Sequence, residues 1–390
     1  MISGTSFDAI EAVALDCSIA GSVVEAELLG HVSVPYSDEL RARVAGILPP
    51  HTTTINEVCE LDTLIGQSFA EVAGGLGDEY FGGETDVVCS HGQTVFHWVE
   101  NQHAKGTLQI GQGAWIAERT GATVVSDVRS RDVAAGGHGA PLVSLMDVLL
   151  LGTKPDSVRA ALNLGGIANV TVVGPTLDPI AFDIGPANAL MDVAVTSLSD
   201  GREYFDRNGE RAERGVVDDV LLAVLLADPY YQLPAPKSTG KEYFHLAYLE
   251  GLVASRRVEP DNLLATLTEL TAGTVADAVR QNHVREIFVS GGGTRNPSLM
   301  RRLREHLCDV PVTLINDLGI SEAAKEAALF ALIGFFTVNG LLGTIASCTG
   351  ARHASVLGSV IPGRQPLLSL ASDEAPTHLR FTAHEGRPVQ

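Results

Sequence analysis

The sequence has few cysteines and an excess of acidic over basic residues, and both features restrict what the chain can be. Its cysteines, at positions 17, 59, 89, 308 and 348, form no Cys-x-x-Cys pair and no Cys/His spacing typical of zinc. A disulfide framework is therefore not expected, and a reducing compartment is indicated. Acidic residues outnumber basic ones by 47 to 27, a net charge of −20, so we expect no binding of nucleic acid or anionic membranes.

Long apolar runs and aromatic residues are also scarce. The most apolar stretch, residues 327–338, is too short to span a bilayer and predicts a buried helix. No secretory signal opens the sequence, so we expect a cytoplasmic protein with no membrane partner. Aromatic residues make up 5% of the chain, against 40 glycines in 390 residues, which is typical of an α/β protein with tight strand-to-helix turns. A chain of this length favours two domains, or three.

Short turns of small residues stand near the start of each half of the chain. The first, in SGTSFDAIEA, precedes a strand pattern and contains Gly4, Thr5 and Ser6, followed by Asp8. The second, in SVRAALNLGGIANVTVVG, places Gly165 and Gly166 between two β-rich runs. Such turns either form ordinary hairpins or bind an anion through backbone N–H groups and hydroxyls. These residues alone leave both interpretations open.

A third glycine-rich loop joins a predicted strand to a predicted helix. In REIFVSGGGTRNPSLM, the loop is Gly291, Gly292 and Gly293, and the helix has Asn296 as its N-cap and Pro297 as its first residue. The order of residues here is not the G-x-G-x-x-G of dinucleotide-binding proteins, and GTKPD at 152–156 is not a P-loop. Both of these modes of nucleotide binding are therefore excluded.

Two aspartates are candidates for chemistry. Asp183, in AFDIGPAN, follows a strand pattern and precedes a predicted helix, which is suitable for a general base and equally suitable for a turn or cap residue. Asp8 is interpreted as an Asx-turn residue or as a carboxylate linked to a phosphate-bound metal.

Four further side chains are candidates for binding a ligand. In HGQTVFH, His91 and His97 match no metal spacing and are expected to be loop or core residues, whereas Gln93 and Thr94 are suited to a sugar-like ligand. Arg129 belongs either to a solvated ion-pair cluster with Arg131 and Asp132 or to a bidentate carboxylate site. Glu326, in a predicted apolar helix, is expected on its solvated face unless it has a function.

Taken together, these segments resemble the anhydro-N-acetylmuramic acid kinases over residues 2 to about 363. The blocks that carry the resemblance, in the order of that family, are SGTSFDAIE, HGQTVFH, DVRSRDVAAGGHGAPLV, NLGGIANVT, FDIGPAN, PKSTGKEYF, SGGGTRNPSLM and KEAALFA, with SCTGARHASVLGSVIPG near the end. Several blocks in sequence are more specific than any one of them.

The resemblance implies an α/β, two-domain, actin-like and hexokinase-like ATPase fold, with mixed sheets flanked by helices and ATP in a central cleft. The first domain is expected at residues 1–135, with about 351–390 returning to it, and the second at 136–350. The boundary falls in the glycine-rich turn GGHGAP, residues 136–141.

The resemblance also implies an activity: ATP-dependent opening of 1,6-anhydro-N-acetylmuramic acid by water, with phosphorylation of the released 6-oxygen, in cell-wall recycling. Asp183 is the implied base, and Mg²⁺ is placed near Asp8 through water. The implied sugar ligands are Gln93, Thr94, Arg129 and Glu326. The implied ATP-binding residues are Gly4, Thr5, Ser6, Asp8, Gly165, Gly166, Gly291, Gly292, Gly293 and Asn296. A small-molecule substrate and a homodimer are expected.

Some positions depart from the pattern of the family. Phe7, Ala9, Glu11 and His138 replace residues that are usual there, and the family begins several residues upstream of Gly4, so the first strand is expected to be short or to start earlier. These departures leave two alternatives: a catalytically silent nucleotide-binding or sensor protein of the same fold, or a kinase of another sugar.

Overall fold

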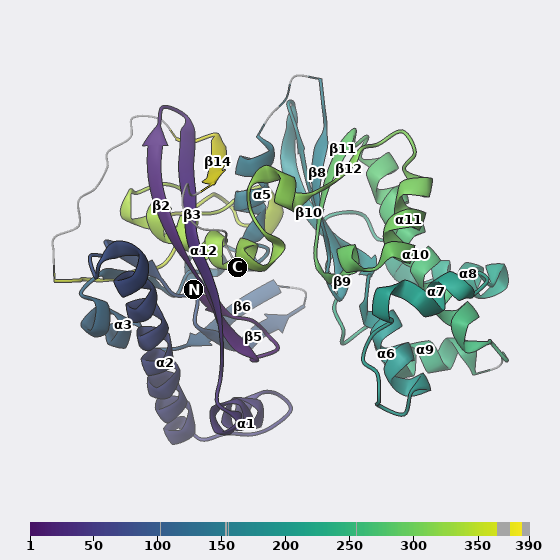
Figure 1. Ribbon diagram of the computed structural model, residues 1–390, viewed down its shortest axis with the longest axis horizontal. Helices are drawn as coiled ribbons and strands as arrows, with labels where there is room; N and C mark the ends of the chain where they lie inside the picture. The colour runs from purple at the N-terminus through teal and green to yellow at the C-terminus, as the bar shows by residue number, and fades with distance from the viewer. Residues whose placement is uncertain (102, 153, 155, 255, 365–374, 384–390) are drawn as a thin grey trace. The chain divides into compact units, whose positions relative to one another are not determined.

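The computed structural model describes residues 1–101, 103–152, 154, 156–254, 256–364 and 375–383 (Figure 1). The chain divides into two compact α/β units. Unit 1 is Met1–Gly152 with Leu318–Gln390, and unit 2 is Thr153–Asp317. No helix in the described ranges is both long enough and apolar enough to cross a membrane.

This division differs from the predicted one, because residues 136–152 and 318–350 belong to unit 1. Their helices, α5 (Val143–Leu151) and α12 (Glu322–Val338), pack against strands and helices of that unit. A buried ion pair between Lys325 of α12 and Asp147 of α5, 2.7 Å long, joins the two helices. The turn at 136–141 is therefore internal to unit 1. Within the predicted returning segment, residues 365–374 and 384–390 lie outside the described residues.

Unit 1 is built on a mixed sheet of order β14-β3-β2-β1-β5-β6 and a smaller sheet of order β13-β7-β4. The strands are β1 (Ile2–Ser3), β2 (Ala9–Ala20), β3 (Val23–Pro35), β4 (Val87–Cys89), β5 (Gln93–Glu100), β6 (His103–Ile110), β7 (Thr123–Ser126), β13 (Ser359–Ile361) and β14 (His378–Ala383). Two backbone bonds place β4 beside β1: the nitrogen of Met1 donates to Cys89 O (2.9 Å), and His91 N donates to Met1 O (3.0 Å). The strands β3-β2-β1-β4-β7 therefore lie in that order.

Unit 2 repeats this order in one sheet, β10-β9-β8-β11-β12. Its strands are β8 (Arg159–Leu164), β9 (Ile167–Gly174), β10 (Leu177–Pro186), β11 (Glu286–Ser290) and β12 (Val312–Leu314). The first three are antiparallel neighbours, and β11 and β12 continue the sheet in parallel, as β4 and β7 do in unit 1. The predicted hairpins at the start of both halves are confirmed, and the repeated order is that of the expected two-domain actin-like class.

Helices cover the sheet of unit 1, and polar side chains cap several of them. These helices are α1 (Asp38–Ile47), α2 (Ile55–Phe81), α3 (Gly113–Thr120), α4 (Ser130–Ala134) and α13 (Ala346–Thr349), besides α5 and α12. Ser37 caps α1 by accepting from Leu40 N (3.2 Å). The long helix α2 lies beside β2 and β3 (Figure 1), because its apolar residues Leu61, Ile65 and Phe69 recur at helical spacing and are fully buried.

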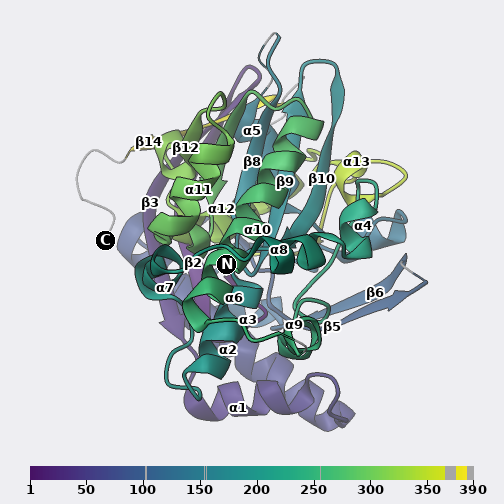
Figure 2. The same ribbon diagram turned by 90° about the vertical axis from the view of Figure 1, so that its right-hand side faces the viewer.

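In unit 2, the helix α10 (Pro260–Gln281) is central to the core and is surrounded by shorter helices (Figure 2). These are α6 (Ala189–Leu198), α7 (Glu210–Arg214), α8 (Asp219–Leu226), α9 (Leu246–Val253) and α11 (Pro297–His306). Unit 2 also contains the 3₁₀ turns η1 (Arg207–Gly209), η2 (Pro229–Gln232) and η3 (Gly292–Arg295). A fourth turn, η4 (Ile315–Leu318), ends at the residue where the second part of unit 1 begins. The α10 side chains Leu264, Leu267 and Leu270 are almost fully buried against this core. The helix also packs against β10, the strand that carries Asp183.

Candidate active site

The turn after β1 has the geometry of an anion-binding loop. Phe7 N donates to Gly4 O (3.0 Å), and Phe7 adopts a left-handed conformation (φ 45°) that closes the turn. Thr5 and Ser6 are exposed, and neither backbone N–H has an acceptor in the part of the chain that is described. No heavy atom lies within 4 Å of the Cβ position at Gly4. Unpaired N–H groups beside open space suit a phosphate.

Gln93 holds this loop in place through hydrogen bonds. Its side chain is fully buried: Oε1 accepts from Ser3 Oγ (2.6 Å), and Nε2 donates to Gly4 O (3.1 Å) and Thr94 O (3.2 Å). The amide is thus occupied by the protein, and its geometry favours fixing the loop rather than the predicted contact with a sugar. Thr94 is half-buried, and its Oγ1 accepts from Gln109 Nε2 (3.2 Å).

Asp8 lies at the end of the same turn and is exposed. Its Oδ1 forms an ion pair with Nη2 of Arg41 on α1, and its backbone O accepts from Tyr36 N (3.1 Å). The predicted metal-linked carboxylate is therefore held at the loop by a neighbouring cation.

Arg129 is fixed between two loops of unit 1. Its Nε donates to Nε2 of His91 (2.7 Å), and Nη1 donates to Gly139 O (2.5 Å). Since Nε2 of His91 accepts, the proton of the ring lies on Nδ1 and is donated to Gly92 O (3.0 Å). Burial and the charge of Arg129 hold the pKa of His91 well below its usual value, so the ring stays neutral. Nη2 of Arg129 has no partner within the described segments and remains available for a ligand.

Two acidic groups lie near Arg129. Although part of the Glu326 residue is exposed, burial of its carboxyl raises its pKa; Arg129 opposes that shift, and Glu11 adds to it. Asp132 is fully buried, with Oδ2 accepting from Gly139 N (2.8 Å) and Oδ1 from Thr349 Oγ1 (2.7 Å). Asp132 therefore fastens the glycine turn, whereas Glu326 has no bonded partner among the described side chains.

In unit 2, the Gly165–Gly166 turn is tied to the start of α6. Asn188 Nδ2 donates to Leu164 O (2.9 Å) and Gly165 O (2.7 Å), and the Ala187 and Ala189 nitrogens donate to Gly166 O (both 2.9 Å). The stem of Lys241 lies on this turn, because its Cε is 2.5 Å from the Cβ position at Gly166. Only glycine admits such a close approach, and the turn thus carries a cation on its surface.

The triple-glycine loop packs on the same edge of the sheet. Gly291 has φ 93°, and its Cβ position lies 2.5 Å from Asn163 Oδ1, so a side chain there is excluded on both counts. The Cβ position at Gly292, by contrast, meets no atom within 4 Å. Asn296 is nearly buried, and its Oδ1 accepts from Leu299 N (3.1 Å), so its side chain caps α11 as expected. Its geometry gives it this capping task; the predicted nucleotide contact remains an interpretation.

Asp183 projects from a bulge in β10, since the β10·β9 register shifts between Asp183 and Gly185. Its Oδ2 accepts from Ser238 Oγ and Thr239 N, both at 2.9 Å, whereas Oδ1 has no donor in the described part of the chain. Burial raises the pKa of Asp183, the two hydrogen bonds lower it, and the Glu242 carboxylate raises it. A carboxylate fixed by one oxygen and free at the other, with a raised pKa, is equipped to accept a proton.

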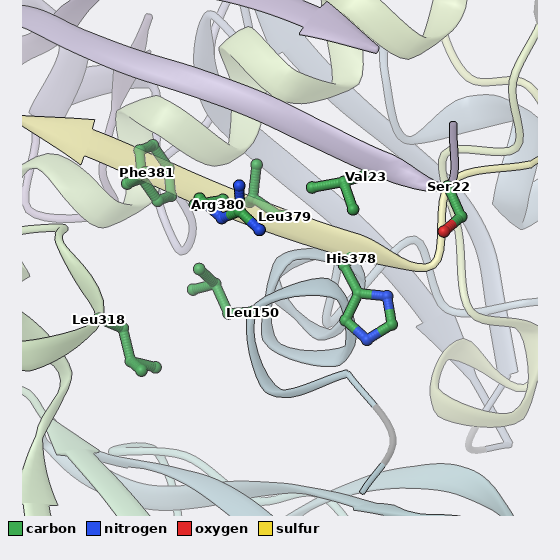
Figure 3. Close-up of a pocket in the computed structure, with 8 residues that line it drawn as sticks. All are labelled: Ser22, Val23, Leu150, Leu318, His378, Leu379, Arg380 and Phe381. Carbon is green, nitrogen blue, oxygen red and sulfur yellow. The ribbon is translucent and has the colours of Figure 1, made fainter. Parts of the chain in front are cut away.

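The two cavities described in the structure lie in unit 1, and neither contains the phosphate loop. The larger, about 480 Å³, lies between β14, α5 and Leu318, with Leu150, His378 and Phe381 on its wall (Figure 3). None of the predicted site residues lines it. The second, about 370 Å³, touches the site at His91, Gly92 and Gln109. The candidate site is therefore defined by its side chains and loops.

Several residues of this arrangement were missed at the level of sequence. His91, Asn188 and the segment 237–241 all hold predicted site residues in place. All three lie within quoted blocks: His91 in HGQTVFH, Asn188 in FDIGPAN and 237–241 in PKSTGKEYF. Their contacts join residues that are 23 to 56 positions apart, and no spacing rule finds these partners.

The repeated strand order, with a glycine turn on the first hairpin of each unit, defines a two-domain protein of the actin-like class. The sequence model of the anhydro-N-acetylmuramic acid kinase family matches residues 1–363. The chain belongs to this family.

Curated relatives cover nearly the whole chain. A Streptomyces coelicolor protein named anhydro-N-acetylmuramic acid kinase is 56% identical over 97% of this chain and 97% of its own. Proteins of the same name from Rhodococcus erythropolis and Caldanaerobacter subterraneus are 54% and 37% identical over 98% and 92% of this chain and 98% and 95% of their own. One solved structure that aligns with this chain is the activator of 2-hydroxyisocaproyl-CoA dehydratase from Clostridium difficile with bound ADPNP. The alignment covers 58% of this chain and 84% of that one, at 15% identity and a TM-score of 0.32, and supports no conclusion.

Proposed function

We propose that this chain is an ATP-dependent kinase that opens 1,6-anhydro-N-acetylmuramic acid with water and phosphorylates the 6-oxygen, giving N-acetylmuramic acid 6-phosphate in peptidoglycan recycling. Membership of the family supports the substrate and the reaction class. The observation that carries the proposal is Asp183, whose Oδ2 is held by two donors while Oδ1 is free.

The proposed reaction begins at Oδ1 of Asp183. This oxygen takes a proton from water as the water oxygen bonds to the anomeric carbon and the anhydro C–O bond breaks. The electron pair of the broken bond passes to the 6-oxygen, which bonds to the γ-phosphorus as ADP leaves. Arg129, fixed by His91, pairs through its free Nη2 with the lactyl carboxylate, and Glu326 hydrogen-bonds the sugar.

The residues proposed to contact the nucleotide are Gly4, Thr5 and Ser6 of the turn after β1, Gly165 and Gly166 of the turn after β8, and Gly291, Gly292 and Gly293 of the loop after β11. The free N–H groups at Thr5 and Ser6, and the open space at Gly4 and Gly292, fit phosphate groups. ATP, with Mg²⁺, supplies the phosphoryl group and its charge neutralisation. Among the described residues, no cluster of three acidic, His or Cys side chains could hold a metal. A magnesium ion would therefore take its ligands from the phosphates of ATP and from water, with Asp8 beside it.

The decisive experiment is a turnover assay with the anhydro-sugar, ATP and Mg²⁺, in which ADP release is coupled to a second enzyme and the product is identified by mass. We expect one sugar 6-phosphate, carrying one added water, for each ADP. Activity on free sugars but not on the anhydro form would indicate a different sugar kinase. ATP binding without turnover of any sugar would indicate a silent nucleotide-binding protein.

Asp183→Asn tests the base directly. The variant keeps the size of the side chain but accepts no proton, so turnover should fall by about 10²–10⁴-fold while calorimetry still detects binding of the anhydro-sugar. Turnover within tenfold of the parent would assign the base to another group, and Glu326→Gln would be tested next.

We also propose that the enzyme acts in the cytoplasm as a homodimer. The need for ATP supports the compartment. The family resemblance supports the dimer, and the exposed Phe96, Trp98 and Leu108 on the neighbouring strands β5 and β6 offer apolar surface for it. Sedimentation at micromolar concentration is the test, and a monomer would contradict the proposal.

A further inference from the structure

The block PKSTGKEYF, residues 236–244, supplies both donors to Oδ2 of Asp183. It lies between η2 and α9 and forms no helix or strand, yet it is anchored at its far end by Phe244, which is fully buried. Phe244 packs edge-on against Tyr230, with ring centroids 5.7 Å apart. A segment without regular structure but with such an anchor is held in one position by its side chains.

Hydrogen bonds reach Asp183 from this segment and from the neighbouring η2 turn. Asp183 N donates to Lys237 O (2.9 Å), Ser238 Oγ and Thr239 N donate to Oδ2 (both 2.9 Å), and Tyr230 Oη donates to the carbonyl oxygen (2.7 Å). These bonds engage the backbone of Asp183 on both sides and one of its carboxylate oxygens. Oδ1 is the polar atom of Asp183 that they leave unengaged.

The neighbouring side chains keep these donors in place. Lys237 Nζ lies 4.5 Å from the centroid of the Tyr230 ring and donates to Tyr230 O (3.1 Å). Asp228 caps the η2 turn through Tyr230 N (2.8 Å) and accepts from Tyr243 Oη (3.0 Å) and Tyr248 Oη (2.9 Å). The segment and the η2 turn are thus tied to each other on both sides of Ser238.

We propose that Ser238, Thr239 and Tyr230 are positioning residues of the kinase reaction, which hold Asp183 by Oδ2 and its backbone so that Oδ1 alone accepts the proton from water. This inference rests on the proposed function. A carboxylate that could rotate would present either oxygen, and its second oxygen would compete for the same water. Fixing Oδ2 removes that freedom before the substrate binds, which is the contribution that preorganisation makes to catalysis.

The same bonds set the proton affinity of the base. The charged and titratable groups that face Asp183 are Glu242, which raises its pKa, and the Tyr230 phenol, whose own pKa is raised by burial and by Asp183. Lys237 lies over that phenol ring. The donors Ser238 and Thr239 act in the opposite direction, because they stabilise the ionised carboxylate. Loss of the Ser238 hydroxyl should therefore move the protonation of Asp183 to higher pH.

The experiment compares kcat/KM for the anhydro-sugar as a function of pH in the parent, Ser238→Ala and Ser238→Thr. In Ser238→Ala, we expect kcat to fall about tenfold and the acid limb of the profile to move to higher pH. Ser238→Thr retains the hydroxyl and should restore both. Ser197→Ala, an exposed serine on α6, is the matched control and should behave as the parent.

Other outcomes overturn the inference in distinguishable ways. If the parent turns over the anhydro-sugar but the acid limb of Ser238→Ala does not move, the positioning role is wrong and the proposed function stands. A uniform loss at all pH values with a lowered Tm and no rescue by threonine would mean a structural role only. If Ser238→Ala fails to fold, Tyr230→Phe, which loses the bond to Asp183 O, must lower kcat without raising the KM for ATP. An inactive parent overturns the proposed function itself.

Discussion

Nε of Arg129 lies 2.7 Å from Nε2 of His91, and this hydrogen bond sets both the direction of the guanidinium and the tautomer of the ring. The His91 ring in turn packs against Phe330 of α12, with ring centroids 4.6 Å apart. A cation that would bind the sugar carboxylate is thereby held by a neutral histidine, which adds no charge of its own to the site.

His91→Phe should weaken both the fold and the site. The variant keeps a ring against Phe330 but leaves the Nε–H of Arg129 without its acceptor, which costs about 1–3 kcal/mol when the donor is buried. We expect urea unfolding to show a loss of that size and the KM for the anhydro-sugar to rise more than that for ATP. His103→Ala, at an exposed position, serves as the control. Parental stability in His91→Phe would contradict the supporting role.

Arg129→Lys tests the proposed carboxylate contact. Lysine has a single ammonium group that cannot bond His91, Gly139 O and a ligand together, so the KM for the sugar should rise about tenfold while that for ATP changes little. Arg131→Lys, at an exposed neighbouring position, is the matched control. Equal rises in both KM values would remove Arg129 from the sugar site.

Asp192, in the first turn of α6, should make stability depend on pH. Burial raises the pKa of Asp192 to about 6, against the nearby Lys241, which lowers it. Between the ordinary value of about 4 and this raised value, the folded state binds more protons than the unfolded state, so stability falls as pH rises through that window. Asp192→Asn should be more stable than the parent by about 1–2 kcal/mol at pH 8 and should lose this part of the pH dependence. Parallel curves of stability against pH for the two proteins between pH 4 and pH 8 would contradict the raised pKa of Asp192.

Gly166→Ala should displace Lys241 from the glycine turn. The new methyl group would meet Cε of Lys241 at 2.5 Å, so the lysine must move. We expect weaker ATP binding, by about tenfold, with stability changed by less than 1 kcal/mol because Lys241 is exposed and flexible. Gly273→Ala in α10, where no atom lies within 4 Å of the Cβ position, should leave ATP binding unchanged and stabilise the helix by about 0.5–1 kcal/mol. Unchanged ATP affinity in Gly166→Ala would separate Lys241 from the nucleotide.

Local signals predicted much of the fold correctly. Asn296 caps the helix that it was expected to cap, and both small-residue turns close antiparallel hairpins. These features depend on neighbours within a few residues, where propensity and capping decide. The division into units was predicted less well. The apolar run of α12 was visible in the sequence, but the strands that cover it were not.

The candidate site could likewise be predicted only in part from the sequence. The sequence by itself determined which residue types stand at Gly4 to Asp8, Arg129, Asp183 and Glu326, and the family to which those patterns belong. Only the tertiary structure decided which groups these residues contact. The Gln93 amide bonds the Gly4 loop, His91 accepts from Arg129, and Ser238 donates to one carboxylate oxygen of Asp183. Those contacts join residues 38 to 89 positions apart. Their existence depends on strand order and packing, which bring distant segments together, and no local pattern in the chain encodes that distance.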